Sequence, residues 1–345
     1  MRRSSLDYRL RVARAVDSLA ITFSWKPLSV LQMKDRSNAS PYGGKGWSPR
    51  KRSMKEEIGT IWSSCGVDTE WTRLKRVLLH CPGIELTGIS DPDKVQMIEI
   101  PFIEVITKQH GHIAAAFRDA GVVVSYVEPS VKPPPNLMFV ADLLFTTPEG
   151  VILARPASSV RAGEERFIAE SLSRLGIPVL KSIRGNGTFE GADAAWLNSD
   201  TVIIGVGFRT NREGASQVSS LLMEMGVGTV GVEIPPGSMH LMGDVRFADQ
   251  DLAICRPGRV SGKTLEVLHE HGFSTHFAPD ESEMTFGLSM NFVALGPKRI
   301  LTADGNPKTQ AFYEDLGLSC QLVDISEVTK AAGGIGCLTG ILERA

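Results

Sequence analysis

The sequence is short of paired cysteines, long apolar segments and net charge, and each shortage argues against a class of protein. Its five cysteines show no CxxC or CxxH spacing, so neither a disulfide framework nor a structural zinc site is indicated. No apolar run approaches the roughly 18 residues that a membrane-spanning helix needs, and no secretory signal pattern opens the chain. We therefore expect reduced thiols in a cytoplasmic protein that has no membrane partner.

The charge of the chain is nearly balanced, with 37 Lys and Arg against 39 Asp and Glu and a formal net charge of −2. Such a balance gives no general electrostatic attraction to nucleic acid, so we expect a small-molecule ligand and no nucleic-acid partner. The 345 residues are 42% hydrophobic and 22% charged, which is enough apolar material for a sizeable core in one large domain or two small ones.

The first 55 residues differ in composition from the rest. Basic residues far outnumber the acids there, and the stretch Asn38–Pro49 is rich in Ser, Gly and Pro without periodicity. We predict a disordered basic extension over residues 1–55 and a single folded domain over 56–345. The Arg- and Ser-rich, acid-poor start also fits an organelle transit peptide, or a start codon assigned too far upstream with Met54 as the true beginning.

Beyond the extension, one pattern recurs five times: an amphipathic helix-like stretch, then a glycine, then a β-rich run. The glycines have the place of helix C′ caps, and they are Gly121, Gly176, Gly226, Gly272 and Gly317. Further strand-like runs lie between the units, so each repeat holds one helix and about three strands. This predicts an α/β arrangement with strands around a central cavity and helices outside. An ordinary doubly wound α/β sheet is the alternative, which five units of matching length disfavour.

A cysteine and a histidine stand out as candidates for chemistry. Cys337 lies in GGIGCLTGIL, where glycines let a ligand approach the backbone and leave amide N–H groups free to point at it. A thiol there would be an accessible nucleophile if a nearby cation or base lowered its pKa, although residue statistics alone favour a buried structural cysteine. His240 follows a Pro-Pro-Gly turn and opens a strand-like segment, where its ring can project into a cavity. Taken alone, it is better interpreted as a structural histidine.

Charged side chains in apolar surroundings supply further candidates. Asp142 in PNLMFVADLLF, and Glu190 and Asp193 in GNGTFEGADAAWL, are costly to bury without a cation or hydrogen-bond donors, and a guanidinium ligand offers both. Asp193 follows Gly-Ala, so a turn-capping role fits it equally well. Arg161 and Arg209 follow strand candidates and precede helices, which suits capture of a ligand carboxylate as well as ordinary salt bridges.

Taken in order, a set of segments resembles a known group of enzymes. The segments are FVADLLF, ARPASSVR, FEGAD, GFRTNREGA, HLMGD and GGIGCLT. They are similar to the guanidino-group modifying enzymes, above all the dimethylarginine dimethylaminohydrolases and more distantly the arginine deiminases and amidinotransferases. The resemblance implies the pentein fold, a five-bladed pseudosymmetric α/β propeller of ββαβ-type units around a central active-site cavity. It makes residues 56–345 a single catalytic domain.

The same resemblance implies a role for each candidate. Cys337 matches the family nucleophile, and His240 matches the catalytic histidine. Glu190 matches the carboxylate beside that histidine, and Asp142 the carboxylate that grips the guanidinium. The implied mechanism is attack of the thiolate on the guanidino carbon, protonation of the departing nitrogen by the histidine, and a covalent thiouronium intermediate. No metal or organic cofactor is implied.

The resemblance also implies which residues bind the substrate. Arg161 and Arg209 match the pair that holds the amino-acid carboxylate in the dimethylarginine enzymes. Met242 stands where deiminases and transferases usually carry an Asp that binds the guanidinium, which favours an N-substituted guanidine or an amidine over plain arginine. Asp244 would substitute for that Asp if it lies on the same face of a regular strand.

We therefore expect a cysteine-dependent hydrolase of a guanidino or substituted guanidino compound that releases an amine or ammonia. The alternatives are an amidinotransferase that moves an amidino group from arginine to an amine, and a non-catalytic binding protein on the same scaffold. The expected ligand is arginine or an N-substituted arginine, and a homodimer is left open.

Overall fold

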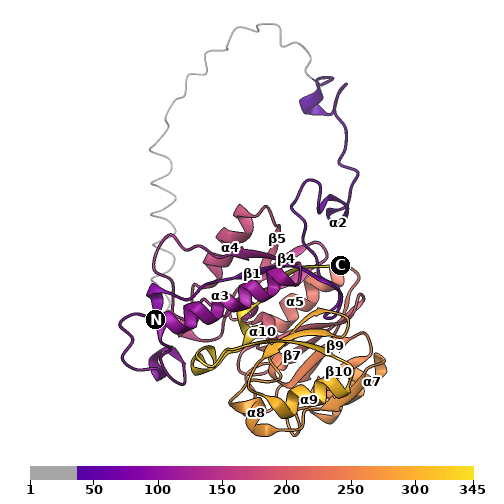
Figure 1. The fold of residues 1–345 in the computed structure, drawn as a ribbon. Helices are drawn as coiled ribbons and strands as arrows, with labels where there is room; N and C mark the ends of the chain where they lie inside the picture. The colour runs from indigo at the N-terminus through magenta and orange to yellow at the C-terminus, as the bar shows by residue number, and fades with distance from the viewer. Residues whose placement is uncertain (1–36) are drawn as a thin grey trace, which may run out of the picture. The chain divides into compact units, whose positions relative to one another are not determined.

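The computed structural model describes residues 37–345 (Figure 1), so residues 1–36 of the predicted extension lie outside its described part. The described residues up to Lys51 form one unit, which holds a turn of 3₁₀ helix, η1 (Ser40–Tyr42). Arg52–Ala345 form a second unit, and helix α2 (Met54–Glu57) lies at its start. A boundary between extension and domain at residue 55 stays a prediction.

The second unit is built from five sheets of three strands each. In every sheet the middle strand pairs antiparallel with one neighbour and parallel with the other. Sheet by sheet, with the middle strand in second place, the strands are β15 (Gly340–Arg344), β1 (Leu74–Leu79) and β2 (Val123–Tyr126); β3 (Leu144–Thr147), β4 (Gly150–Leu153) and β5 (Val179–Ser182); β6 (Ala194–Asn198), β7 (Thr201–Val206) and β8 (Gly228–Glu233); β9 (Val245–Asp249), β10 (Leu252–Cys255) and β11 (Ser274–Phe277); β12 (Val293–Gly296), β13 (Arg299–Ala303) and β14 (Ser319–Val323).

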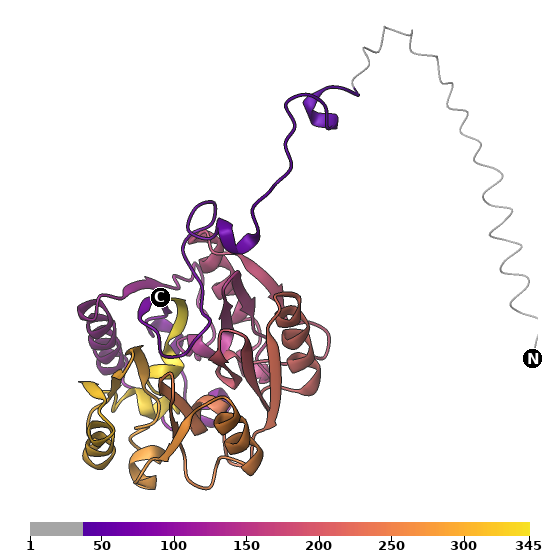
Figure 2. The same cartoon turned by 90° about the vertical axis from the view of Figure 1, so that its right-hand side faces the viewer.

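In each sheet a helix connects the middle strand to the parallel strand, which gives the predicted ββαβ unit. These helices are α3 (Ile103–Asp119), α4 (Glu165–Arg174), α5 (Arg212–Glu224), α7 (Gly262–Glu270) and α9 (Pro307–Asp315). Figure 2 shows the helices on the outer side of a ring of sheets. The five-bladed α/β propeller is thereby confirmed, and a doubly wound sheet is excluded because the strands of residues 52–345 form separate small sheets rather than one.

The glycines predicted to end the helices have the expected conformation. Gly121, Gly176, Gly226, Gly272 and Gly317 have φ angles of 79, 69, 78, 86 and 80°. Each lies directly after a helix C-cap residue. Residues with a side chain rarely adopt this left-handed conformation, so glycine allows the chain to leave the helix and enter the third strand of the blade.

Short helical turns complete the blades, and four of them lead directly into a first strand. Those four are η4 (Val140–Leu143), η6 (Gly191–Asp193), α6 (Leu241–Asp244) and α10 (Ile335–Leu338). The others are η2 (Ile84–Leu86), η3 (Asp93–Val95), η5 (Ser159–Arg161), α8 (Glu281–Thr285) and η7 (Val328–Ala331). Among the helices of residues 37–345, none is both long and apolar enough to cross a bilayer.

The last strand closes the ring by pairing with the first. β15 lies antiparallel to β1, so the C-terminal segment completes a sheet that begins near the start of the domain. Leu342 of β15 is fully buried and packs in a core cluster with Leu144 of the next blade. Arg344, also buried, donates hydrogen bonds to the carbonyl oxygens of Thr72 (2.6 Å) and Ala294 (2.9 Å). The closing strand is thus anchored to the blades on both of its sides.

Truncating Leu342 is expected to destabilise the domain. Leu342→Ala removes a fully buried side chain and should lower the free energy of unfolding by about 2–5 kcal/mol, measured by urea denaturation. Leu342→Met, which nearly conserves the volume, should cost less than about 1.5 kcal/mol. Equal losses in both variants would contradict the packing described for β15.

Candidate active site

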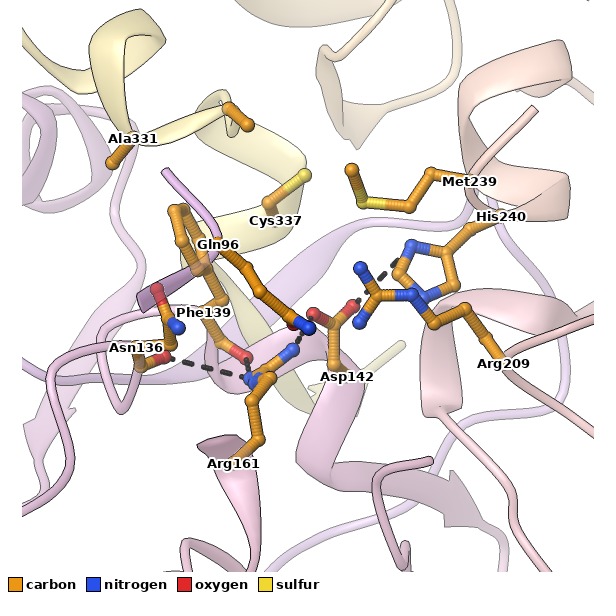
Figure 3. Close-up of a pocket in the computed structure, with 11 residues that line it drawn as sticks. Gln96, Asn136, Phe139, Asp142, Arg161, Arg209, Met239, His240, Ala331 and Cys337 are labelled. Atoms are coloured by element: carbon orange, nitrogen blue, oxygen red, sulfur yellow. Dashed lines mark hydrogen bonds and ion pairs between the residues drawn. The ribbon is translucent and has the colours of Figure 1, made fainter. Parts of the chain in front are cut away.

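A pocket gathers residues from distant parts of the chain (Figure 3). Cys337 and His240, predicted as nucleophile and acid–base partner, both line it, together with Asp142. The complete lining is Gln96, Asn136, Phe139, Asp142, Arg161, Arg209, Met239, His240, Ala331, Ala332 and Cys337. The fold therefore brings the candidate thiol, imidazole and carboxylate to one cavity.

The polar residues of the site occupy corresponding places in successive blades. Asp142 comes just before β3, Glu190 before β6, His240 before β9 and Cys337 before β15. First strands of neighbouring blades contact one another, as β3 does with β15 and β9 with β12, so the residues that precede them meet at one end of the ring. In the remaining blade the corresponding polar residue is Asn291, just before β12.

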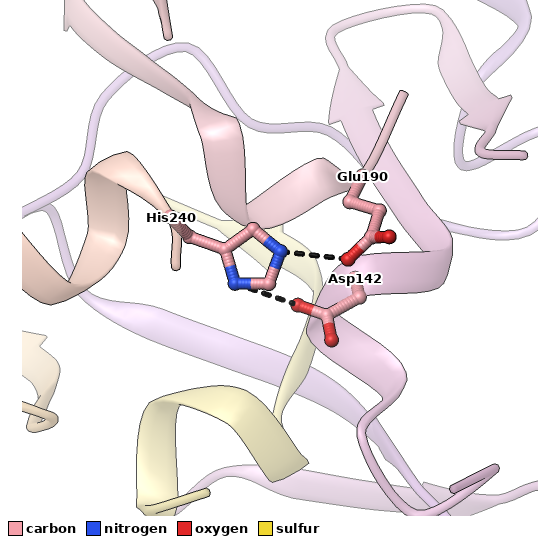
Figure 4. Close-up of side chains that lie close together, drawn as sticks. All are labelled: Asp142, Glu190 and His240. Carbon is pink, nitrogen blue, oxygen red and sulfur yellow. Dashed lines mark hydrogen bonds and ion pairs between the residues drawn. The ribbon is translucent and has the colours of Figure 1, made fainter. Parts of the chain in front are cut away.

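His240 is paired with a buried carboxylate (Figure 4). Its Nε2 lies 2.7 Å from Glu190 Oε2, and its Nδ1 lies 3.8 Å from Asp142 Oδ1. Burial alone would lower the pKa of His240, but the carboxylates of Asp142, Asp193 and Glu190 raise it to about 9. Burial would raise the pKa of Glu190, but His240 and the nearby arginines lower it to about 2. The pair is therefore an imidazolium and a carboxylate at neutral pH. Glu190 is fully buried and does not line the pocket, so it reaches the pocket by its contact with His240.

Arg161 is occupied by carboxylates of the protein. Its side chain is buried, its Nη1 lies 2.5 Å from Asp142 Oδ2, and its Nε donates a hydrogen bond to Glu164 Oε2 at 2.9 Å. Burial disfavours the charged form, but Asp142 and Glu164 outweigh it and raise the pKa of this guanidinium above its ordinary value. Few donors are left for a ligand, so this geometry favours the salt-bridge alternative: Arg161 orients Asp142.

Arg209 is better placed to meet a ligand. It lines the pocket, its guanidinium lies 5.1 Å from the ring centroid of Phe208, and its Nη1 lies 3.5 Å from both carboxylate oxygens of Glu190. Asp193 does not line this pocket: its Oδ1 accepts a hydrogen bond from the backbone N–H of Leu241 at 3.0 Å. This contact favours the capping alternative, because Asp193, at the end of η6, holds the first N–H of the turn α6.

Two local predictions about the segment after the Pro-Pro-Gly turn are wrong. His240 does not open a strand, because the helical turn α6 follows it and β9 begins only at Val245. Asp244 ends that turn and does not share a strand face with Met242. The hydrogen bond from the start of α6 to Asp193 comes from another blade, which explains why the segment alone did not reveal the turn. Asp244 lines a second pocket that also contains Cys337.

Asn291 clamps Cys337, a contact that sequence reasoning missed. The backbone N–H of Cys337 donates to Asn291 Oδ1 at 3.0 Å, and the N–H of Gly336 donates to the Asn291 carbonyl oxygen at 3.0 Å. Because Oδ1 must accept, the other end of the amide is the NH₂ group, which lies 3.2 Å from Cys337 Sγ. A Cβ at Gly334 would lie 2.8 Å from the Asn291 side chain, so this glycine leaves room for the clamp.

The surroundings of Cys337 act on its thiol in opposite directions. Burial raises the pKa of the thiol, and the negative charge of Asp142 raises it further. The backbone of Gly334, the amide of Asn291 and the charge of Arg246 lower it, but burial prevails. A cationic ligand next to Asp142 would cancel the repulsion of a thiolate, so ligand binding and thiol activation favour each other.

Asp142, Glu190 and His240 are also close enough together to be considered as metal ligands, since their donor atoms lie within 4.8 Å of one another. Arg161 Nη1 lies 2.5 Å from Asp142 and 3.8 Å from Glu190. A metal ion held by these residues would lie next to a buried guanidinium, and the repulsion between the two cations disfavours it. The charge pattern suits an organic cation better.

Sequence reasoning missed two residues of the site for different reasons. In the sequence, Glu164 of RAGEE has the pattern of a common acidic residue at the start of a helix. Its contact with Arg161 is seen only in the folded structure. Asn291, in SMNFVALG, lies in no recognisable motif. The blade repeat could have found it, because a polar residue before the first strand recurs in the other blades.

Comparisons with known proteins agree with this fold. A family model described as arginine deiminase matches residues 87–272. The N(G),N(G)-dimethylarginine dimethylaminohydrolase of Streptomyces coelicolor is 29% identical over 205 residues, which cover 59% of this chain and 74% of that protein. The solved complex of DDAH from Pseudomonas aeruginosa with citrulline has a TM-score of 0.66 at 22% identity and covers 79% of this chain and 100% of that one. SxtG, an amidinotransferase of Microseira wollei, has a TM-score of 0.66 at 16% identity, with 81% and 97% covered.

Removing the donor to Cys337 Sγ is expected to make the thiol less acidic. Asn291→Asp keeps an oxygen for the Cys337 N–H but replaces the NH₂ group by a second oxygen. Loss of a hydrogen bond to a charged group should slow alkylation by iodoacetamide at pH 7 by about tenfold. The pH profile of the alkylation rate measures the effect. Asn198→Asp is the matched control, because among residues 37–345 the Asn198 side chain hydrogen-bonds through its Oδ1, which accepts from the N–H of Asp200. An unchanged profile in Asn291→Asp would contradict the assigned amide orientation.

Proposed function

This chain belongs to the arginine deiminase family of enzymes, and from that premise we propose that it hydrolyses a guanidino or substituted guanidino compound with Cys337 as nucleophile. The products are a ureido compound and an amine or ammonia. One observation supports the proposal above the others: Asp142, in the same pocket as the thiol and the imidazolium, has a buried oxygen without a partner.

The unpartnered oxygen is what a guanidinium would bind. Asp142 Oδ2 is engaged by Arg161, whereas Oδ1 has no hydrogen-bond partner among the described residues. A buried acceptor without a donor costs about 1–3 kcal/mol, and an N–H group of a planar ligand cation removes that cost. A cation held there lies in the pocket that Cys337 lines, and Arg209 is available for a carboxylate at the other end of the ligand.

The first half of the reaction forms a covalent intermediate. The Cys337 thiolate adds to the guanidino carbon, whose positive charge Asp142 stabilises. The C–N bond then breaks while the imidazolium of His240 gives its proton to the leaving nitrogen. An amine or ammonia departs, and a thiouronium remains on the sulfur. Glu190 keeps His240 in its charged form before this step.

The second half regenerates the thiol. His240, now neutral, takes a proton from water, and the resulting hydroxide adds to the thiouronium carbon. The thiolate leaves, and the carbon becomes the carbonyl of a ureido product. If an amine attacked in place of water, the result would be amidino transfer. This alternative is retained because the amidinotransferase SxtG has a similar fold. Met242, in place of a second guanidinium-binding Asp, favours an N-substituted guanidine as substrate.

Hydrolysis is tested with Nω,Nω-dimethylarginine and arginine, each with and without glycine as acceptor. We expect a ureido product without acceptor, and an acid quench should trap an adduct on Cys337 whose added mass identifies the amidino fragment. Cys337→Ala should abolish both, while Cys320→Ala, a half-buried thiol outside the pocket lining, should retain them. Product only in the presence of glycine would establish transfer, and no adduct in any mixture would remove the enzymatic proposal.

The ion pair with Glu190 predicts a shift in pH dependence. The carboxylate favours imidazolium, so Glu190→Gln should lower the pKa of His240 from about 9, and the proton donor is then lost at lower pH. We expect the alkaline limb of the kcat/KM profile to move to lower pH, with a loss of at least about tenfold at pH 8. Glu164→Gln removes a buried carboxylate that contacts Arg161 rather than His240, so it should leave that limb in place. A limb that moves equally in both variants would contradict the role of Glu190.

A further inference from the structure

A larger pocket, of about 400 Å³, adjoins the site and shares Met239, His240, Ala332 and Cys337 with it. The thiol and its acid–base partner therefore lie where two pockets meet. Figure 3 shows Cys337 with its sulfur directed toward Met239 and His240. A ligand whose reacting carbon lies at Cys337 has one part beside Asp142 in the smaller pocket and room for another part in the larger one.

The wall of the larger pocket near the thiol has a polar part, formed by Asn291 and His240, and an apolar part. Met239, Met242 and Leu288 form the apolar part. Thioether and alkyl groups accept no strong hydrogen bonds, so this part of the wall suits an alkyl substituent better than a bare NH₂ group. The leaving nitrogen of the substrate is therefore expected to carry carbon.

Another part of the same pocket holds the carboxylate of Asp244, with the Ser238 hydroxyl and two arginines in the same lining. Asp244 lines the pocket and is 4% exposed, and its Oδ2 has no hydrogen-bond partner among residues 37–345. Of the Arg256 guanidinium, Nη2 is engaged, at 2.5 Å from Glu281 and 2.6 Å from Thr285. Arg259 donates to a backbone carbonyl at 2.8 Å. The carboxylate of Asp244 is thus the acceptor that a ligand group can satisfy, and an ammonium or hydroxyl group would do so.

The size of the pocket points to a substituent longer than methyl. A water molecule occupies about 30 Å³, and pockets for drug-sized ligands span roughly 300–1,000 Å³. Neither the attacking water nor a methylated nitrogen needs a pocket of about 400 Å³.

We propose that the larger pocket is the subsite for the substituent on the leaving nitrogen, and that this substituent is an alkyl chain of several carbons ending in a hydrogen-bond donor. The inference rests on the proposed function, which places the guanidino carbon at Cys337. The thiolate adds to that carbon, the bond to the chain-bearing nitrogen breaks, and His240 supplies its proton. The alkylamine leaves through the larger pocket, and water converts the thiouronium to the ureido product.

A steric block tests the subsite. Gly243 lines the larger pocket, and a Cβ there would meet nothing within 4 Å, so Gly243→Leu should narrow the pocket without a clash. With Nω-methyl-, Nω-butyl- and Nω-(4-aminobutyl)arginine as substrates, Gly243→Leu should lower kcat/KM for the long substituents at least about tenfold more than for methyl. Gly243→Ala, the matched variant, should have a smaller effect. Equal losses for all three substrates, or turnover of the methyl substrate alone by the unmodified enzyme, would overturn the proposal.

Substitution of Asp244 tests whether the alkyl substituent of the substrate ends in a hydrogen-bond donor. Asp244→Asn is isosteric and should reduce the preference for aminobutyl over butyl by about tenfold, because a charged hydrogen bond is lost. Nω-(4-hydroxybutyl)arginine separates a requirement for charge from a requirement for any donor. Asp200→Asn, in the β6–β7 turn outside the pocket lining, controls for the change in net charge. If Asp244→Asn leaves the preference for aminobutyl over butyl unchanged, the assignment of Asp244 as the partner of the terminal donor is wrong.

A readout without turnover separates this inference from the proposed function. 1,4-Diaminobutane should slow alkylation of Cys337 by iodoacetamide in the unmodified protein, and should do so less in Gly243→Leu. Protection of this kind in a protein that turns over no guanidine would reject the hydrolase and keep the pocket as an amine site. Absence of protection together with hydrolysis of methylarginine would reject the subsite and keep the hydrolase.

Discussion

The pairing of β15 with β1 is the constraint on which the rest of the site depends. It joins the end of the chain to the first strand of the domain and closes a ring of five blades. Cys337 lies in the turn just before β15, so strand pairing at the closure, rather than any local motif, sets the position of the thiol. The other blades present Asp142, Glu190 and His240 toward the same end of the ring, and closure adds the Cys337 thiol to them.

The charges inside that ring explain why the site suits a cation. Asp142, Glu164 and Glu190 are buried against Arg161, and Glu190 also pairs with His240. Buried ions of this kind persist only when they are paired and hydrogen-bonded, since desolvation costs several kcal/mol for each ion. Among the described residues, the network leaves Asp142 Oδ1, which faces the pocket residues, and Glu164 Oε1 without a hydrogen-bond donor. The same contacts that hold the carboxylates in place therefore leave one acceptor directed at a ligand.

Much of the fold followed from local signals. A helix that ends in a left-handed glycine is recognisable from a few residues, and five such glycines at similar spacing gave the number of blades. The turn at α6 was missed because its first N–H is held by Asp193 from another blade. The candidate site followed mainly from family resemblance. The resemblance identified the residues but not their contacts: Arg161, matched to a ligand-binding arginine, is held by Glu164, and Asn291 was not recognised at all.

The sequence by itself determined the repeat, the order of the candidate residues along the chain and the chemical types available, because caps, periodicity and residue identity are local properties. Only the tertiary structure decided which oxygen of Asp142 lacks a hydrogen-bond donor, which arginine is engaged by carboxylates and which amide faces the sulfur. Each of these depends on side chains that reach one another from different blades, and no property of a single segment fixes such a distance.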